Sequence, residues 1–265
     1  MKKIALLSFI AILVLLSLTI LFISSQQSND EKEPTNGHKA NDNEQEVEYY
    51  WGVDSASYTD ESLYQCVIDQ FGQPSVWGRY LGDIEDVSHG LDADEVAYLH
   101  GNGIHILVIY NHFSDATGYE NGIQEAEQAI SFAEQLDIPE GVAIFGDIEP
   151  NYPVDEQFIN GWYDRLVDSP YQPALYGVFK EDSELFTSFN KATEEAQRNT
   201  ILWTAYPQKE ITAKDNAPDF EAIAPEEAEL FGWQYAINAE TCNIDTNLFT
   251  DAMIDVLWKS ESADD

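Results

Sequence analysis

Two carboxylates placed two residues apart are the feature of this sequence best suited to chemistry. Asp147 and Glu149 follow a short apolar run rich in strand-forming residues, and Pro150 comes directly after them. Side chains at i and i+2 of a strand point to the same face, and proline has no N–H with which to continue a strand ladder. We therefore expect both acids to project together from a strand end. The alternative is that Asp147 caps the next helix and Glu149 is a solvated loop acid.

Such a pair can carry out the acid and base steps of glycosidic bond cleavage, provided that the two pKa values are pushed apart. A like charge nearby disfavours ionisation of a carboxyl group. The spacing therefore predicts that the pKa of Glu149 is raised and that Asp147 ionises first.

The elements that must position this pair alternate along the chain between strand and helix patterns. We expect helices over 60–71, 92–102, 119–136, 155–167 and 182–192. We expect strands over 49–56, 75–82, 104–113, 142–149, 172–179, 201–206, 230–237 and 243–249. About five β/α units followed by three strands predict an α/β fold, a distorted TIM-like (β/α) barrel with parallel strands. An open doubly wound sheet is the alternative, but no glycine-rich phosphate loop follows the first strand.

Barrel enzymes place their chemistry at the carboxyl ends of the strands. Asp54, at the end of the first strand, and Asp245, near the last strand, therefore join Asp147 and Glu149 as candidate catalytic residues. Of the five histidines, only His112 follows a strand closely enough to face a pocket. Aromatic residues near strand ends could stack on sugar rings, although about half of them should be core residues: Tyr80, Tyr110, Tyr176, Trp203, Tyr206, Trp233 and Tyr235.

The ends of the sequence predict export. Residues 1–23 hold two lysines and then a long apolar stretch that could span a bilayer, so we expect an uncleaved membrane anchor rather than a cleaved signal peptide. Residues 24–48 are polar and read as a flexible linker. Residues 49–258 have the composition of one globular domain, and 259–265 form an acidic tail. The domain is then expected as a monomer on the extracellular face of a bacterial membrane, or secreted if the anchor is cleaved.

The net charge of −37, with only 12 Lys and Arg residues, excludes nucleic acid as a partner because phosphate binding needs clustered cations. Cys66 and Cys242 could form a disulfide outside the cell, but the sequence leaves open whether they meet. No cysteine and histidine spacing resembles a zinc site. We expect neither a metal nor a cofactor, although carboxylates alone could hold Ca²⁺ or Mg²⁺, and a metal-dependent hydrolase is therefore a third functional class.

Several motifs together resemble known families. Gly52-Val-Asp-Ser-Ala-Ser57, the Asp147-Ile-Glu149 pair, Leu202-Trp-Thr-Ala-Tyr206 and Trp233-Gln-Tyr235 with Asn243-Ile-Asp-Thr-Asn247 resemble the Chalaropsis-type lysozymes, glycoside hydrolase family 25. The middle of the chain resembles a sister group, the glycoside-hydrolase-like domain of unknown function 1906. The motifs that carry this second resemblance are Trp77-Gly-Arg-Tyr-Leu81, Leu91-Asp-Ala-Asp-Glu-Val96 and Gly103-Ile-His-Ile-Leu107.

The lysozyme resemblance implies cleavage of the β-1,4 bond between N-acetylmuramic acid and N-acetylglucosamine in peptidoglycan. It implies Glu149 as general acid, with Asp147 raising its pKa and orienting a substrate group or water, and Asp54 and Asp245 shaping the site. Whether water or the acetamido group of the substrate attacks stays open. The alternative function is a non-catalytic wall- or glycan-binding module on the same barrel.

Overall fold

The structure is a computed structural model that describes residues 47–260. The expected membrane anchor, nearly all of the expected linker and most of the acidic tail lie outside these residues. Within 47–260, no helix is both long enough and apolar enough to cross a membrane.

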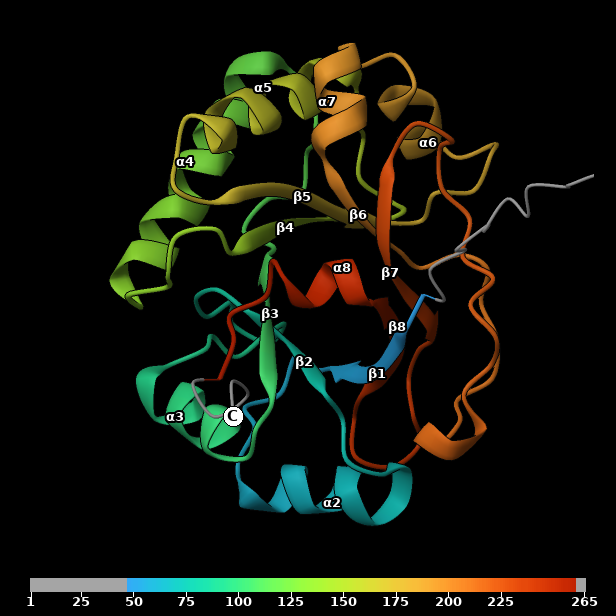
Figure 1. Cartoon of the computed structure of the whole chain (residues 1–265). Helices are drawn as coiled ribbons and strands as arrows, with labels where there is room; N and C mark the ends of the chain where they lie inside the picture. The colour runs from blue at the N-terminus through green and yellow to red at the C-terminus, as the bar shows by residue number, and fades with distance from the viewer. Residues whose placement is uncertain (1–46, 261–265) are drawn as a thin grey trace, which may run out of the picture. The chain divides into compact units, whose positions relative to one another are not determined.

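Eight strands form a closed barrel in which each strand pairs with its neighbours in sequence, and the last pairs with the first (Figure 1). This confirms the expected α/β barrel. The strands are β1 (Tyr49–Asp54), β2 (Val76–Tyr80), β3 (His105–Tyr110), β4 (Ala143–Ile148), β5 (Gln172–Gly177), β6 (Ile201–Thr204), β7 (Glu229–Ala236) and β8 (Asp245–Thr250).

Helices connect the first six strands, as the alternation predicts. They are α2 (Glu61–Phe71), α3 (Ala93–Gly101), α4 (Tyr119–Gln135), α5 (Glu156–Val167), α6 (Glu184–Phe189) and α7 (Glu194–Asn199). Asp60, Asp92 and Asp155 each accept a hydrogen bond from a backbone N–H in the first turn of the following helix, which satisfies a group that the helix leaves unpaired. The short α7, a 3-10 turn η1 (Lys214–Asn216) and α8 (Asp251–Ile254) were not expected from the sequence.

The direction of β8 corrects the expectation of an all-parallel barrel. Strands β1 to β7 run parallel to one another, whereas β8 runs antiparallel to both β7 and β1. Only eight residues join β7 to β8, 237–244, and a parallel connection needs a crossover of a dozen or more. The first residue of β8, Asp245, therefore pairs with the last residue of β1, Asp54.

Side chains alternate between the inside of the barrel and the layer beneath the helices. The inner core includes Leu107, Ile109, Phe145 and Phe249, and Met253 of α8 joins it. Figure 1 shows α8 within the ring of strands. Because α8 follows the end of β8 that lies beside Tyr49, it fills the end of the barrel opposite to the carboxyl ends of the parallel strands. The site must therefore open at the other end.

A buried ion pair fixes the connection from β1 to α2. Arg79 of β2 and Glu95 of α3 are both fully buried, and Arg79 Nε donates to Glu95 Oε1 at 2.6 Å. The guanidinium also donates to the backbone oxygens of Ser55 and His89, and Glu95 accepts from the N–H of Thr59 at 2.7 Å. The pair thus anchors the loop that follows Asp54.

Replacing Glu95 with Gln should destabilise the domain by about 3–5 kcal/mol, because it leaves the buried Arg79 charge without a counter-ion. Urea unfolding followed by circular dichroism measures this change. The matched control is Glu194→Gln, which breaks an exposed pair with Arg198 and should cost no more than about 1 kcal/mol. Equal effects of the two substitutions would contradict the structural role assigned to the buried pair.

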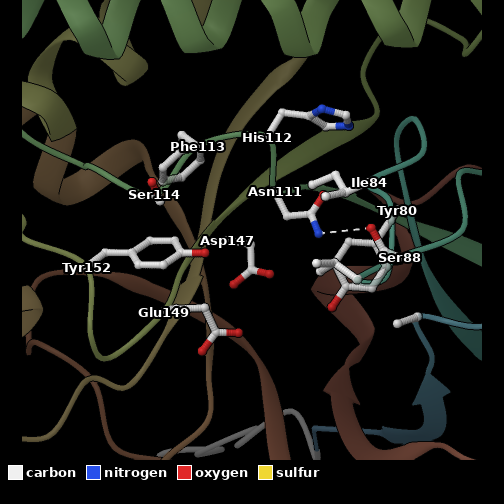
Figure 2. Close-up of a pocket in the computed structure, with 12 residues that line it drawn as sticks. Tyr80, Ile84, Ser88, Asn111, His112, Phe113, Ser114, Asp147, Glu149 and Tyr152 are labelled. Atoms are coloured by element: carbon white, nitrogen blue, oxygen red, sulfur yellow. Dashed lines mark hydrogen bonds between the residues drawn. The ribbon is translucent and has the colours of Figure 1, made fainter.

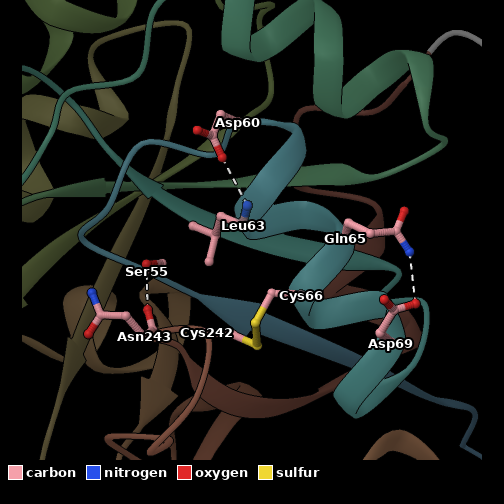
Figure 3. The surroundings of a disulfide bond; sticks show 8 residues. All are labelled: Ser55, Asp60, Leu63, Gln65, Cys66, Asp69, Cys242 and Asn243. Carbon is pink, nitrogen blue, oxygen red and sulfur yellow. Dashed lines mark hydrogen bonds between the residues drawn. A yellow bond between two sulfur atoms is a disulfide. The ribbon is translucent and has the colours of Figure 1, made fainter.

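Cys66 and Cys242, left open by the sequence, form a disulfide (Figure 3). It joins α2 to the β7–β8 loop across a sequence separation of 176 residues. The next residue, Asn243, accepts a hydrogen bond from Ser55 Oγ through its backbone oxygen at 2.7 Å and donates from its side chain to Ser57. The disulfide ties α2 to the loop that precedes Asp245, and the two hydrogen bonds of Asn243 join that loop to the one that follows Asp54.

Removing the disulfide with Cys66→Ala and Cys242→Ala should lower the free energy of unfolding by about 2–5 kcal/mol, because a long loop is freed in the unfolded chain. Urea denaturation of the double variant measures the loss. Wild-type protein in reducing agent should lose a similar amount. A double variant as stable as the oxidised wild type would show that the disulfide adds nothing.

Candidate active site

A cavity of about 410 Å³ opens at the carboxyl end of the barrel, beside the end of β4 (Figure 2). Asp147 is the next-to-last residue of β4 and Glu149 follows the strand, so the predicted acid pair does emerge on one side. Figure 2 shows both carboxyl groups directed into the cavity, with Tyr152 beside them. The lining also includes Ala56, Tyr80, Ile84, Val87, Ser88, Asn111, His112, Phe113 and Ser114.

Asp147 is buried, with 4% of its surface exposed, and within residues 47–260 its Oδ1 has no hydrogen-bond partner. Burial raises the pKa of Asp147 well above its usual value, and the charges of Glu149 and Asp54 raise it further. The helix-cap alternative is wrong, since Asp155 caps α5. Asp147 is therefore a buried carboxyl group at the base of the cavity whose ionisation is disfavoured.

Glu149 lies at the rim, where its side chain is exposed to solvent. The pKa of Glu149 is raised, in the predicted direction, but the cause is partial burial of its carboxyl group and not the charge of Asp147. The predicted order of ionisation is wrong, however: the more deeply buried Asp147 is the member whose pKa is raised further, so Glu149 ionises first. The sequence shows that the two charges are close, but not which carboxyl is desolvated.

Asp54 and Asp245 lie together beneath the mouth. Burial and the charge of Asp245 raise the pKa of Asp54 to about 7. Hydrogen bonds from Asn247 and Gln234 act in the opposite direction and lower this pKa. Burial raises the pKa of Asp245 to about 6, opposed by a hydrogen bond from the N–H of Asn238 and helped by the charge of Glu149. Neither residue lines the cavity, although the charge of Asp54 reaches Asp147.

A hydrogen-bond network crosses the barrel interior around Asp54. Asn247 Nδ2 donates to Asp54 at 2.7 Å, and Gln234 Nε2 donates to both Asp54 at 3.1 Å and Asp245 at 3.2 Å. Tyr176 donates its hydroxyl to Gln234 Oε1 at 2.6 Å, and the indole of Trp203 donates to Asn247 Oδ1 at 2.9 Å. Five strands, β1 and β5 to β8, thus contribute to one polar cluster.

The neighbouring strand leaves room for this cluster. At Gly78 of β2, which pairs with Asp54, a Cβ atom would lie 2.7 Å from the Cβ of Asp54. Any larger residue would force Asp54 to move. The glycine in Trp77-Gly78-Arg79 is therefore part of the site, although it carries no chemistry.

The structure supports only part of the predicted set of sugar-stacking aromatics. Tyr80 lines the cavity, whereas Tyr176 and Trp203 serve the internal network and Tyr206 is half-buried after β6 without lining the cavity. Tyr110, Trp233 and Tyr235 are not sugar-stacking residues. Their rings point outward from the barrel into the layer beneath the helices and loops. Tyr110 bonds Glu125, Trp233 bonds the backbone oxygen of Pro207, and Tyr235 accepts from Trp51.

Sequence reasoning missed several lining residues. Asn111, Phe113 and Ser114 follow the end of β3, and Tyr152 lies in the β4–α5 loop. His112, noted from its position after a strand, does line the cavity, and its Nε2 lies 2.8 Å from the backbone oxygen of Leu81. Asp54 and Asp147 were selected because they lie at the carboxyl ends of strands. The same rule would have selected Asn111, Phe113 and Ser114. Tyr152 is brought back to the mouth only by the course of the loop.

Across 47–260, no group of three or more His, Cys, Asp or Glu side chains is arranged to hold a metal ion.

Comparisons with solved structures give three informative matches. A protein of B. stearothermophilus described as uncharacterized is 35% identical, with a TM-score of 0.77 over 79% of this chain and 100% of that one. The Tat-secreted protein Rv2525c of Mycobacterium tuberculosis, solved with L-tartrate, is 14% identical, with a TM-score of 0.50 over 75% of this chain and 93% of that one. The modular autolysin LytC of Streptococcus pneumoniae is 18% identical, with a TM-score of 0.50 over 76% of this chain and 46% of that one.

The last two likenesses show a shared fold. A comparison with curated protein sequences finds no match. The family comparison is decisive, because the Rv2525c-like, glycoside hydrolase-like domain matches residues 74–248, a range that includes Asp147, Glu149 and Asp245. This confirms the resemblance inferred from the motifs: the chain belongs to the Rv2525c-like, glycoside hydrolase-like family.

Proposed function

We propose that this domain is a glycoside hydrolase that cleaves β-1,4 bonds of peptidoglycan or a related cell-wall glycan, as a lysozyme does. The observation that carries the proposal is the placement of two carboxyl groups with raised pKa values, Asp147 and Glu149, in one cavity at the barrel mouth. The fold shared with a pneumococcal autolysin supports a cell-wall substrate.

Glu149 is the proposed general acid. Its position at the rim lets its carboxyl group approach a glycosidic oxygen from the cavity wall, and its raised pKa favours the protonated form that must be present when the substrate arrives. The proton passes to the leaving oxygen as the bond from that oxygen to the anomeric carbon breaks. Water supplies the hydroxyl group of the new sugar end, either directly or after the acetamido group of the substrate has attacked, and the remaining proton of that water returns Glu149 to its acid form.

Asp147 is proposed to position the substrate rather than to tune Glu149. A protonated carboxyl group can both donate and accept a hydrogen bond, so it can hold an amide or a water molecule beside the reacting carbon. The charge of Asp54 acts on Asp147, and the charge of Asp245 acts in turn on Asp54. This arrangement keeps negative charge low around the site until Glu149 has lost its proton.

For the whole chain, we propose an extracellular location, with residues 1–23 as a membrane anchor, 24–48 as a linker, 49–258 as the active domain and 259–265 as a tail. The apolar N-terminal segment and the disulfide support this location, since disulfides persist in oxidising compartments.

Replacing Glu149 with Gln should lower kcat about 10²–10⁴-fold, because the side chain keeps its shape but has no proton to give. The assay is release of reducing ends from purified cell walls. The control variant is Glu181→Gln, which changes an exposed glutamate outside the cavity and should retain full activity.

Activity that survives Glu149→Gln would remove this mechanism. The alternative, a glycan-binding module, would be identified by sedimentation of the wild-type domain with insoluble wall and no release of sugar. In that case Glu149→Gln would leave binding unchanged.

Replacing Asp147 with Asn should stabilise the domain at pH 8 and change little at pH 4. The folded pKa of Asp147 lies above its unfolded value, so the folded state binds the extra proton and wild-type stability falls as pH rises between the two values. Asparagine has no proton to lose and escapes that penalty. The unfolding temperature at pH 8 should rise by at least about 2–4 °C, the shift that 1 kcal/mol produces in a domain of this size.

Thermal unfolding at both pH values measures the difference. The control, Asp219→Asn, changes an exposed acid and should give equal small shifts at pH 4 and pH 8. An unfolding temperature of Asp147→Asn that falls at pH 8 would mean that the wild-type carboxylate is stabilised in the fold.

A further inference from the structure

Asp54 and Asp147 are almost equally buried, with 3% and 4% of their surfaces exposed, but their hydrogen bonds differ. Asn247 Nδ2 lies 2.7 Å from Asp54 Oδ2, and Gln234 Nε2 lies 3.3 Å and 3.1 Å from the two oxygens of the same carboxyl group. In the described part of the chain, Asp147 Oδ1 accepts no hydrogen bond. Donors that reach a carboxyl group favour its charged form. The geometry therefore favours a charge on Asp54 over a charge on Asp147.

Asp245 shares one of these donors with Asp54. Gln234 Nε2 also donates to Asp245 Oδ2 at 3.2 Å, and the backbone N–H of Asn238 donates to Asp245 Oδ1 at 2.6 Å. A side-chain amide carries two N–H hydrogens, so Gln234 can serve both carboxyl groups at once. The amide of Gln234 therefore links the hydrogen bonds of the two acids.

Tyr176 fixes the orientation of the Gln234 amide. Its hydroxyl donates to Gln234 Oε1 at 2.6 Å, which leaves the NH₂ group facing the acids. Burial raises the pKa of Tyr176 well above its usual value, and the charges of Asp147 and Asp54 raise it further, so the hydroxyl keeps its proton. The reverse orientation would place the amide oxygen against the oxygens of two carboxylates, a contact without a donor. Gln234 is buried, so its amide cannot turn to solvent instead.

Charged and titratable groups act on the pair from several strands. Burial and the charge of Asp245 raise the pKa of Asp54, whereas its hydrogen bonds and then the charge of Arg79 on β2 lower it. Burial raises the pKa of Asp245, and the charge of Glu149, after β4, raises it too. The pKa of Tyr80 on β2 is raised well above its usual value by burial and by the surrounding acids, so this phenol stays neutral. The shared amide therefore opposes burial and like charge, the two effects that would keep the pair protonated.

We propose that Gln234 is a positioning residue that assigns the proton among the three acids: its amide lets Asp54 and Asp245 ionise first and so keeps the neutral carboxyl group at Asp147, in the cavity. The charge that forms on Asp54 then disfavours ionisation of Asp147. The inference rests on the proposed function, in which protonated Asp147 holds an amide or a water molecule. It adds the interaction by which the fold keeps that carboxyl group protonated.

The test follows the protonation of the three acids by ¹³C NMR of the full chain with labelled aspartate carboxyl carbons, assigned with Asp54→Asn, Asp147→Asn and Asp245→Asn. In the wild type, Asp54 and Asp245 should titrate at lower pH than Asp147. Gln234→Met keeps the length of the side chain but has no N–H. It should raise the midpoint of Asp54 by about one to two pH units, the size of one hydrogen bond to a charged group. The midpoint of Asp147 should fall, because the charge on Asp54 is then absent over that range.

Asn247→Leu is the matched control for the link between the two acids, because the side chain of Asn247 donates to Asp54 and the donors of Asp245 are other groups. Both Asn247→Leu and Gln234→Met should raise the midpoint of Asp54. Only Gln234→Met should also raise the midpoint of Asp245. Equal behaviour of Asp245 in the two variants would contradict the role of the shared amide.

Two further variants keep the test independent of folding defects. Tyr176→Phe removes one oxygen atom, keeps the ring and frees the Gln234 amide to turn, so it should shift the midpoint of Asp54 in the same direction by a smaller amount. Gln124→Met makes the glutamine-to-methionine change at an exposed position of α4 and should shift none of the three midpoints.

Opposite shifts of Asp54 and Asp147 would not come from a loosened fold, because entry of water would lower the raised midpoints of both. Unchanged midpoints in Gln234→Met, or a joint fall, would therefore overturn the inference. A wild-type midpoint of Asp147 below that of Asp54 would overturn it as well.

The outcomes separate the two proposals. If the wild type releases no sugar from cell walls but the midpoints depend on Gln234 as stated, the catalytic proposal falls and the assignment of the proton stands. If the wild type hydrolyses walls and the midpoints do not depend on Gln234, the assignment is wrong and the catalytic proposal stands.

Discussion

The hydrogen-bond network around Asp54 is the constraint on which the rest of the site depends. A carboxyl group buried inside a barrel is costly unless it is hydrogen-bonded, and here Gln234 and Asn247 supply the donors. Their own acceptors are in turn satisfied by Tyr176 and Trp203. The network therefore specifies which residues β5 to β8 must direct inward, and it holds Asp54 behind Asp147.

The site is assembled at a cost in stability that other interactions offset. Asp54, Asp147 and Asp245 all have raised pKa values in the folded state, so each opposes folding near neutral pH, where the unfolded chain would be ionised. The Arg79–Glu95 pair and the disulfide both act on the loops next to these acids. The same interactions that stabilise the domain thus keep the carboxyl groups close together, which is a frequent compromise in active sites.

Two residues at the mouth show how orientation decides role. Tyr80 and Tyr110 are both aromatic residues at strand ends, but Tyr80 faces the cavity whereas Tyr110 faces α4, where it donates to Glu125 at 2.7 Å. The period of two along a strand fixes that neighbours point to opposite faces. It does not fix which face is the inside of the barrel when both faces are buried and apolar. For this reason the sequence expected about half of the aromatic set to be core residues without identifying which, and the structure assigns Tyr110, Trp233 and Tyr235 to the core.

The sequence by itself determined the order and approximate bounds of the strands, the barrel class, and the pair Asp147 and Glu149 at the end of β4. These follow from local patterns: apolar periodicity, helix caps and a proline after a strand. The antiparallel direction of β8, which brings Asp245 to the same end as Asp54, follows from the short connection between the last two strands, a signal in the sequence that the parallel prediction did not use. Only the tertiary structure decided that Gln234 joins Asp54 to Asp245 across the barrel. It also decided that Asp147 is more deeply buried than Glu149 and holds its proton longer, because desolvation depends on what the whole fold packs around a group.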